Sequence, residues 1–234
     1  MKNIVVLTGA GISAESGIKT FRDSNGLWEN HRIEDVASSE GFYRNPKLVY
    51  EFYNLRRRQL KEPQLKPNSA HEALKKLEDH FGANFLLVTQ NVDNLHDRIG
   101  HKNLIHMHGE LQKVSCQKDQ SVYEWPEDLD SESLCPDCKE PNLLRPHIVW
   151  FGEMPLYMEQ IYEALSLCDI FISIGTSGHV YPAAGFVAQT PSNCLRIEIN
   201  NQGTNISQEF DKHFIGPAST EVPKVVDLIL SGEL

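Results

Sequence analysis

Residues 5–17, VVLTGAGISAESG, run from an apolar stretch straight into a glycine-rich turn. Gly9, Gly11 and Ala14 match the pattern G-x-G-x-x-[G/A] directly after a predicted strand. Glycines in such a turn let the backbone approach a pyrophosphate, and the N-terminus of a following helix favours its negative charge. The motif predicts a dinucleotide site; a tight glycine turn without a ligand is the alternative.

Apolar runs and helix-like stretches alternate along the rest of the chain. The runs are rich in Val, Ile, Leu and Phe, as in buried parallel strands. Amphipathic segments separate them, such as residues 69–81, with Ser69 as the expected N-cap, and residues 157–168. This alternation predicts an α/β fold with a doubly wound, mostly parallel, Rossmann-like sheet and ligands at the carboxyl ends of its strands. The predicted strands lie in residues 3–8, 84–91, 103–109, 169–177 and 194–200.

Two stretches interrupt this alternation and predict a small second domain. Residues 29–66 carry helical patterning, and residues 113–146 carry three cysteines and several turn formers. We expect both insertions to lie over the edge of the sheet. The large Rossmann-like part then comprises residues 1–28, 67–112 and 147–234, and both parts form one functional unit.

A dehydrogenase would place an acidic residue at the end of its second strand, about 20 residues beyond the glycine motif. Residues 21–30, FRDSNGLWEN, do not read as a strand. The dinucleotide is therefore expected to be held differently from that of a dehydrogenase, which argues against simple hydride transfer.

The composition excludes several classes of protein. The 234 residues are 40% hydrophobic and 23% charged, as in soluble globular proteins. With 32 acidic against 22 basic side chains, broad nucleic-acid binding is disfavoured. No window reaches the roughly 18 apolar residues of a membrane span, and the first apolar run is too short for a signal peptide. Because the five cysteines also suit a reducing compartment, we expect a cytoplasmic monomer without nucleic-acid or membrane partners.

Polar side chains follow the second predicted strand. In residues 89–96, TQNVDNLH, the side chains of Gln90, Asn91 and Asp93 come at the end of this strand. Carboxamides there can match the amide of nicotinamide or a ribose hydroxyl. A polar loop that only caps the strand is the alternative.

Residues 106–110, HMHGE, hold the best candidate for a catalytic group. His106, His108 and Glu110 alternate, so they would share one face if the strand continued. His108, the last residue before a glycine, is best placed to face the crevice as a general base, because the pKa of histidine lies near neutrality. A histidine with satisfied hydrogen bonds, or a metal held by His106 and His108, are the alternatives.

Six motifs occur in the order and context of one known family. They are GAGISAESGIKTFR (9–22), TQNVD (89–93), HMHGE (106–110), RPHIVWFGE (145–153), GTS (175–177) and GPAS (216–219). Over roughly residues 3–230 the chain resembles the sirtuins, which are NAD-dependent protein lysine deacylases. Within them it resembles the bacterial class with a tyrosine and an arginine in the acyl pocket. The resemblance implies NAD as cofactor and acylated protein lysines as substrates.

The resemblance also implies a reaction. The acyl carbonyl oxygen attacks the nicotinamide ribose and displaces nicotinamide, and His108 acts as general base on a ribose hydroxyl. The products are free lysine, nicotinamide and an O-acyl-ADP-ribose. The competing hypotheses are an oxidoreductase or a mono-ADP-ribosyltransferase on the same cofactor, and a module that senses NAD without turnover.

By the same resemblance, two sets of residues border the ligands. The substrate peptide is expected to lie as an added strand between residues 149–153 and 178–180, an arrangement that tolerates many sequences. The implied cofactor residues are Gly9, Ala10, Gly11, Ile12, Ser13, Glu15, Gly17, Phe21, Arg22, Trp28, Gln90, Asn91, Val92, Asp93, Gly175, Thr176, Ser177, Asn200, Asn201, Gln202 and Ala218. The implied substrate residues are Ala37, Tyr53, Arg56, Val149, Phe151, Gly152, Glu153 and Val180.

The stretch YNLRRRQL, which starts at Tyr53, places three arginines in a row in an acidic protein. Tyr53 and Arg56 share one face of a helix, whereas Arg57 and Arg58 point elsewhere and are expected to be solvated or paired with acids. A guanidinium and a phenol can together bind a carboxylate. Within the resemblance this pair implies removal of succinyl and malonyl groups as well as acetyl, with Ala37 leaving room. Without the resemblance, a surface pair is the simpler interpretation.

Three cysteines resemble an incomplete zinc site. Cys135 and Cys138 form a C-x-x-C pair, and Cys116 is followed by Asp119 at the position where most sirtuins have another cysteine. Three thiolates and a carboxylate can complete a tetrahedron around zinc. We expect any such zinc to be structural; an insertion that folds without metal is the alternative.

Overall fold

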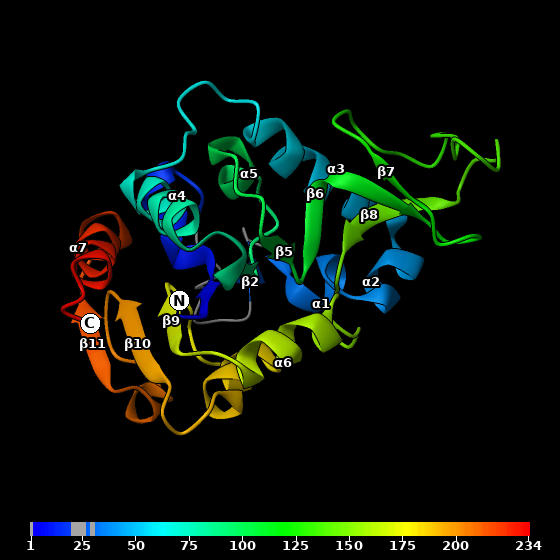
Figure 1. Ribbon diagram of the computed structural model, residues 1–234. Helices are drawn as coiled ribbons and strands as arrows, with labels where there is room; N and C mark the ends of the chain where they lie inside the picture. Colours follow the sequence, from blue (N-terminus) through cyan, green and yellow to red (C-terminus); the bar gives the residue numbers. More distant parts are fainter. Residues whose placement is uncertain (1, 20–26, 29–30) are drawn as a thin grey trace.

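A parallel sheet of six strands forms the centre of the computed structural model, which describes residues 2–19, 27–28 and 31–234 (Figure 1). The strands are β1 (Ile4–Thr8), β4 (Phe85–Thr89), β5 (Leu104–His106), β9 (Ile170–Ile174), β10 (Leu195–Asn200) and β11 (Lys212–Ile215). Their order is β11-β10-β9-β1-β4-β5. All five predicted strands are present, which confirms the predicted fold class. β11 was not predicted, because its residues are mostly exposed and form no apolar run.

Helices cover both faces of this sheet, as expected for a doubly wound fold. They are α4 (Ser69–Phe81), α7 (Ala218–Ser231), α6 (Met158–Ser166) and the 3₁₀ helix η4 (Ala183–Gln189). α4 and α7 lie side by side against one face, and Val6 of β1 shares their buried cluster with Leu74 (Figure 1). α6 and η4 cover the other face, where Leu7 shares a cluster with Ile161. Successive residues of β1 therefore point into separate cores.

The start of α4 differs by one residue from the prediction. Asn68, not Ser69, is the N-cap, and its side chain accepts from the backbone N–H of Ala70 at 3.0 Å. The backbone N–H of Asn68 in turn donates to Nδ1 of His71 at 3.3 Å. Ser69 donates its hydroxyl to the carbonyl of Ser219 at the start of α7, at 2.6 Å. Ser and Asn are nearly equal as N-caps, so residue type alone could not place this boundary.

The glycine motif is not followed by the helix that the sequence predicts. Two single-turn 3₁₀ helices, η1 (Ala10–Ile12) and η2 (Ala14–Ser16), take its place. The expectation that the N-terminus of an α-helix favours the negative charge of a pyrophosphate here is therefore wrong. The glycines allow two strand ends to approach closely. The N–H of Gly11 donates to the carbonyl of Gly175 at 2.9 Å, and a Cβ on Gly11 would lie 2.6 Å from the Cα of Gly175. Gly175 has a φ of 62°, which glycine adopts without strain.

A second core lies beside the central sheet, where short helices meet an antiparallel sheet of three strands (Figure 1). The elements are α1 (Ile33–Val36), α2 (Ser39–Arg44), α3 (Pro46–Gln59), β6 (Gly109–Cys116), β7 (Val122–Glu124) and β8 (Leu144–Ile148). Phe52 of α3, Val114 of β6 and Leu144 of β8 are buried together in this core. We propose that these elements form the small second domain expected from the two insertions.

The remaining described elements are short. β2 (Leu27–Trp28) and β3 (His31–Arg32) pair with each other in an antiparallel ribbon and not with the central sheet. The prediction that residues 21–30 do not supply the second strand of a dehydrogenase falls mostly outside the described residues, of which only Leu27 and Trp28 belong to this stretch. The other elements are η3 (Gly82–Asn84), α5 (Leu95–Ile99) and η5 (Ser207–Glu209).

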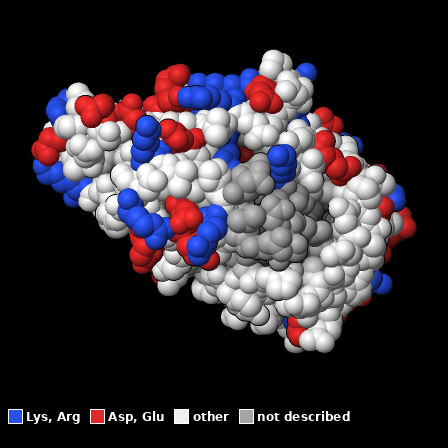
Figure 2. Space-filling model, turned by 180° about the vertical axis from the view of Figure 1, so that it is seen from behind, with Lys and Arg blue, Asp and Glu red and all other residues white. Residues whose placement is uncertain are grey.

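Basic and acidic side chains are mixed on the face that Figure 2 shows. Several basic side chains pair with acids, for example Lys118 with Glu140 at 2.7 Å. Among the helices in the described part of the chain, none is long and apolar enough to cross a membrane.

Candidate active site

The carboxyl ends of β1, β4 and β9 border a cavity of about 450 Å³, which α3 and β8 border on another side. This volume suits a small-molecule ligand. The expected residues on its wall are Gly9, Ala10, Gly11, Ala37, Tyr53, Arg56, Gln90, Asn91, Val92, Asp93, His108, Val149, Phe151, Gly152, Glu153, Gly175, Thr176, Ser177 and Val180. The structure therefore brings most of the expected cofactor and substrate residues to one place.

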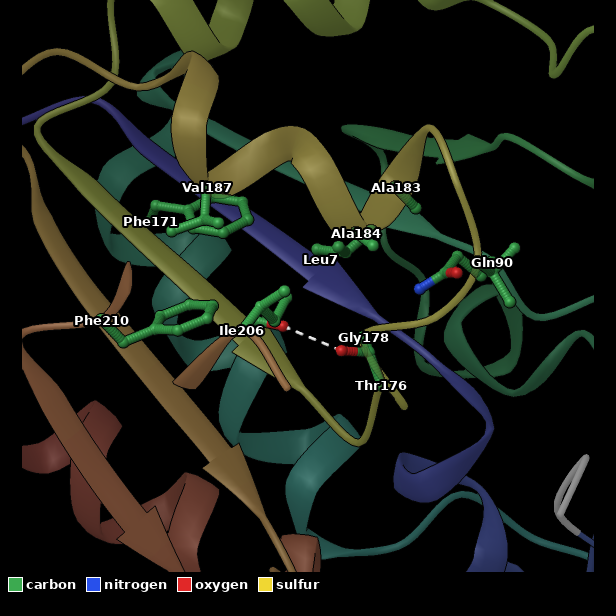
Figure 3. A pocket seen from close by; sticks show the side chains of 12 residues that line it. Leu7, Gln90, Phe171, Thr176, Gly178, Ala183, Ala184, Val187, Ile206 and Phe210 are labelled. Carbon is green, nitrogen blue, oxygen red and sulfur yellow. Dashed lines mark hydrogen bonds between the residues drawn. The ribbon is translucent and has the colours of Figure 1, made fainter. Parts of the chain in front are cut away.

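A second cavity, of about 10 Å³, lies between β9, η4 and residues 206–210 (Figure 3). On its wall the hydroxyl oxygens of Ser173 and Thr176 are 3.2 Å apart. Such a volume holds about one water molecule. The larger cavity is therefore the candidate ligand site, and Gln90 borders both.

His108 has the protonation state that a general base needs. Its Nδ1 lies 3.2 Å from the carbonyl oxygen of Gln90, and because a carbonyl can only accept, Nδ1 carries the hydrogen. Nε2 is then the nitrogen without a hydrogen. Burial lowers the pKa of His108 below its usual value of 6.5, although the hydrogen bond to Gln90 raises it in part. The ring is therefore neutral near pH 7.

His106 does not share the face of His108, which corrects the expected alternation. β5 ends at His106, and the chain turns before β6, whose first residue, Gly109, has a φ of 82°. Nε2 of His106 lies 3.1 Å from Oδ2 of Asp97; burial lowers the pKa of His106, but the contacts with Asp97 outweigh burial and raise it. Among the described residues, His106 groups with Asp97 and Glu110 as possible metal ligands and not with His108. The alternative of a metal held by both histidines is therefore wrong.

Ser13, Asn91 and Asp93 join the glycine loop to the loop after β4. The hydroxyl of Ser13 donates to Oδ2 of Asp93 at 3.0 Å and accepts from Nδ2 of Asn91 at 3.1 Å. The same amide nitrogen donates to the carbonyl of Gly9 at 3.2 Å. Burial raises the pKa of Asp93, although hydrogen bonds from Leu95 and Ser13 lower it in part. These contacts fix the cavity wall through side chains from two loops.

Tyr53 and Arg56 line the same wall of the cavity, as their spacing on α3 predicts. Tyr53 is fully buried and accepts a hydrogen bond from Nε1 of Trp150 at 3.0 Å. Burial raises the pKa of Tyr53 well above its ordinary value, so the phenol stays protonated. Nη1 of Arg56 donates to the carbonyl of Phe52 at 2.6 Å, and the guanidinium carbon lies 3.2 Å from the centre of the Phe52 ring.

The other two arginines of the run differ from each other. Arg58 pairs with Asp128 at the surface, as expected. Arg57 was expected to be solvated or paired with an acid, and this is wrong. It is 1% exposed, and its guanidinium donates to the carbonyl of Leu111 at 2.8 Å and to Oδ1 of Asn54 at 2.5 Å. Burial lowers the pKa of Arg57 to about 10.

Glu153 lies on the cavity wall, but protein groups engage its carboxylate. Arg145 donates to both oxygens, at 2.7 and 3.0 Å. The hydroxyl of Ser39 donates at 3.0 Å and the backbone N–H of Trp150 at 2.9 Å. Burial raises the pKa of Glu153, but these contacts outweigh burial and lower it, so the carboxylate is ionised. Glu153 therefore anchors its segment through contacts within the protein.

Several expected cofactor residues lie off the cavity wall. Ile12 is fully buried in the core under the sheet. Glu15 accepts from the N–H and the hydroxyl of Ser219, at 2.9 and 2.6 Å, and so ties the glycine loop to α7. Nδ2 of Asn200 donates to the carbonyl of Thr176 at 2.6 Å, which supports the wall from behind.

Other expected residues can be located only in part or line no part of the cavity. Phe21 and Arg22 lie outside the described residues, and Trp28 is described only as backbone in β2. The other residues that are off the wall are Ser13, Gly17, Asn201, Gln202 and Ala218.

Some residues of the wall were not expected. Leu60 lies seven residues after Tyr53, so the helical period of α3 could have indicated it. Trp150 and His179 lie within the two segments expected to border the peptide, residues 149–153 and 178–180, but were not named individually as substrate residues. The unexpected residues are Ile18, Lys19, Gln59, Leu60, Leu111, Ile148, Pro155 and Tyr181.

Four possible metal ligands meet at the far end of β6: Cys116, Asp119, Cys135 and Cys138. Their ligand atoms all lie within 4.8 Å of one another, and the sulfurs of Cys116 and Cys138 are 3.9 Å apart. Zinc bonded tetrahedrally at about 2.3 Å holds two sulfurs about 3.8 Å apart, so the donor set fits zinc. β6 has eight residues, and at about 3.3 Å per residue the cluster lies roughly 26 Å along the strand from His108. That separation suits a structural role.

The fold and the cavity define an α/β protein with a ligand site at the carboxyl ends of its strands. Residues 9–182 match the Sir2 family. The NAD-dependent protein deacylase of Bdellovibrio bacteriovorus is 62% identical over 229 residues, which cover 98% of this chain and 97% of that protein. The enzyme of the same name from Escherichia coli K12 is 57% identical over 230 residues, covering 98% and 82%. The chain belongs to the Sir2 family, which confirms the resemblance to the sirtuins.

Solved structures agree with this assignment. A Sir2 homologue in complex with NAD has a TM-score of 0.87 and 35% identity, and the match covers 98% of this chain and 90% of the other. Sir2Af2 bound to a myristoylated histone peptide has a TM-score of 0.74 and 30% identity, with coverage of 99% and 93%.

Proposed function

We propose that this protein removes acyl groups from protein lysines in an NAD-dependent reaction. The observation that carries the proposal is the state of His108: a neutral ring on the cavity wall, whose Nδ1 donates to Gln90 and whose Nε2 carries no hydrogen. The names of the relatives from Bdellovibrio and Escherichia coli, both NAD-dependent protein deacylases, support it.

NAD, when bound, supplies the ribose carbon that the acyl oxygen attacks and the nicotinamide that leaves. His108 accepts a proton at Nε2 from a ribose hydroxyl, and the carbonyl of Gln90 stabilises the resulting charge through Nδ1. Asn91 and Asp93 would hold the ribose and nicotinamide side of a bound NAD, and the glycine loop would lie against its phosphates. The other implied cofactor residues on the cavity wall would border the rest of the cofactor. With one water consumed, the products would be free lysine, nicotinamide and an O-acyl-ADP-ribose.

The acyl groups include succinyl and malonyl as well as acetyl on this proposal. Arg56 and Tyr53 line one wall of the cavity, and Ala37 leaves room beside them. A guanidinium and a protonated phenol together bind the terminal carboxylate of an acidic acyl chain. An acetyl group lacks that carboxylate and uses the same cavity without this contact.

A peptide substrate is favoured over the competing hypotheses by the position of two segments. Residues 149–153 and 179–181 border the same cavity as His108, so that an extended peptide between them presents its acyl-lysine to the base. An NAD sensor does not require a peptide at this place. We infer that the partners are acylated proteins.

The test is a mass-spectrometric assay on one peptide carrying either acetyl- or succinyl-lysine, with and without NAD. Loss of both acyl groups only with NAD, together with O-acyl-ADP-ribose, is the expected result. Removal of acetyl but not of succinyl would mean that Tyr53 and Arg56 do not bind an acidic acyl chain. Nicotinamide release without an acylated peptide would favour the transferase.

We also propose a structural zinc ion held by Cys116, Asp119, Cys135 and Cys138. The donor types and the separations of their ligand atoms support it. A cytoplasmic location and a monomeric state without nucleic-acid or membrane partners complete the proposal. The absence of disulfides among the five cysteines, all of which lie in the described residues, supports a reducing compartment.

A further inference from the structure

Trp150 makes a buried hydrogen bond to Tyr53 that links two segments 97 residues apart in the sequence. Trp150 is 2% exposed and Tyr53 is fully buried, and Nε1 of the indole lies 3.0 Å from the phenolic oxygen. An indole N–H can only donate, whereas a phenol can donate and accept. The direction of this bond is therefore fixed: Trp150 donates and Tyr53 accepts.

The indole of Trp150 is held on several sides. Its backbone N–H donates to Oε2 of Glu153 at 2.9 Å. The guanidinium carbon of Arg145 lies 3.6 Å from the centre of the ring, and Arg145 is itself bound to both oxygens of Glu153. The ring of Phe42 has its centre 5.2 Å away. The first contact fixes the backbone, and Arg145 and Phe42 pack on the ring, so rotation of the indole would lose both ring contacts as well as the bond to Tyr53.

This contact restricts the hydroxyl of Tyr53. A phenol has a single hydrogen, and it cannot point at the indole N–H that its oxygen accepts from. We propose that Trp150 is a positioning residue, whose N–H turns the Tyr53 hydroxyl so that it donates to the terminal carboxylate of an acidic acyl chain beside Arg56. The inference deepens the proposed function and rests on it.

The state of the phenol supports this role. Burial raises the pKa of Tyr53 well above its ordinary value, so the hydroxyl keeps its hydrogen at any pH used for assays. The phenol is therefore protonated under the same conditions in which a succinyl or malonyl carboxylate is ionised. An acetyl group lacks the carboxylate, so the orientation of the Tyr53 hydroxyl matters less for its removal.

The first test compares Trp150→Phe with the wild-type protein on acetyl- and succinyl-lysine peptides of one sequence. The substitution removes the N–H donor and keeps an aromatic ring. We expect kcat/KM for succinyl-lysine to fall about threefold to tenfold, mainly through KM, as for one lost hydrogen bond. We expect the value for acetyl-lysine to fall less than the value for succinyl-lysine, so that the ratio of the two activities changes. Phe42→Leu is the packing control: it removes one ring contact of the same indole and keeps the N–H donor, so it should change this ratio less than Trp150→Phe does.

The second test places Trp150→Phe in a Tyr53→Phe background. With the phenol gone, the tryptophan has nothing to orient, so the double variant should have the same succinyl selectivity as Tyr53→Phe alone. Equal losses on both peptides, or additive losses in the double variant, would mean that Trp150 only packs, and would overturn the inference. A wild-type protein that removes acetyl but not succinyl would overturn the acidic-acyl proposal as well, and this is visible before any variant is made.

Discussion

The carbonyl oxygen of Gln90 determines which ring nitrogen of His108 carries the hydrogen. It lies 3.2 Å from Nδ1 and accepts the single N–H of the neutral ring, which leaves Nε2 as the nitrogen that would accept a proton. Because the partner is a backbone group, replacing the side chain of Gln90 leaves this contact in place. The chemistry of the base thus depends on the path of the loop after β4.

The pH dependence of the reaction should reflect this environment. Burial lowers the pKa of His108, so the ring stays neutral, and able to accept a proton, below the pH at which an ordinary histidine is protonated. We expect the acidic limb of kcat to have its midpoint below about 6.5. A profile of kcat against pH measures it. His108→Tyr should leave almost no turnover, and a midpoint above 7 would contradict the lowered pKa.

Arg56→Met should separate the two proposed acyl substrates. The variant loses a charged hydrogen bond to the terminal carboxylate, which corresponds to about 10- to 150-fold in kcat/KM for succinyl-lysine. Acetyl-lysine should be affected by less than about threefold. Arg58→Met is the control, because Arg58 pairs with Asp128 at the surface. Equal losses on both substrates in Arg56→Met would count against the acyl pocket.

The cysteine cluster predicts about one zinc per chain in purified protein. Elemental analysis measures it, before and after dialysis against a chelator. Asp119→Ala should lose zinc to the chelator more readily than the wild type, because one of four ligands is gone. Asp137→Ala, a neighbouring acid outside the cluster, should behave like the wild type. A stable wild-type fold with well under one zinc per chain would reject the zinc proposal.

Buried histidines should destabilise the fold in acid. His71, His96 and His101 are buried next to one another: the ring centre of His96 is 4.8 Å from that of His71 and 5.4 Å from that of His101, and burial lowers the pKa of each. Burial lowers the pKa of His71 from 6.5 to about 4 in the folded protein. As the pH falls below 6.5, this histidine therefore becomes protonated in the unfolded chain but not yet in the folded protein. From pH 8 to pH 5 this histidine alone lowers the free energy of unfolding by about 2 kcal/mol.

Denaturant unfolding at the two pH values measures this effect. In His71→Gln the loss of stability between pH 8 and pH 5 should be smaller by that amount. His80→Gln provides the comparison, because His80 is exposed at the end of the same helix. An unchanged pH dependence in His71→Gln would show that the ring titrates normally.

The five predicted strands of the central sheet could be recognised because a strand that helices cover on both faces consists of a continuous run of apolar residues. The start of α4 was missed by one residue, because Asn68 and Ser69 are almost equally good caps. β11 was missed because an exposed edge strand needs no apolar residues. The apolar runs alone predicted the fold class, but they did not predict where each helix and strand begins and ends.

The sequence predicted which residues would line the site better than it predicted which side chains would contact each other there. Helical spacing correctly placed Tyr53 and Arg56 on one wall. It could not reveal Trp150, because the contact with Tyr53 spans 97 residues of sequence. Arg57 was misjudged because a buried guanidinium depends on acceptors, such as the carbonyl of Leu111, that only the folded chain provides.

The burial of Arg57 has a mechanical consequence. Its guanidinium donates to the carbonyl of Leu111 and so links α3 to β6. Arg57 directly follows Arg56, which is proposed to bind the acyl carboxylate, and Leu111 lies three residues after His108, the proposed base. The two segments that carry Arg56 and His108 are therefore joined by this buried hydrogen bond. On the proposed function, the distance between these two residues limits the length of acyl chain that can reach from one to the other.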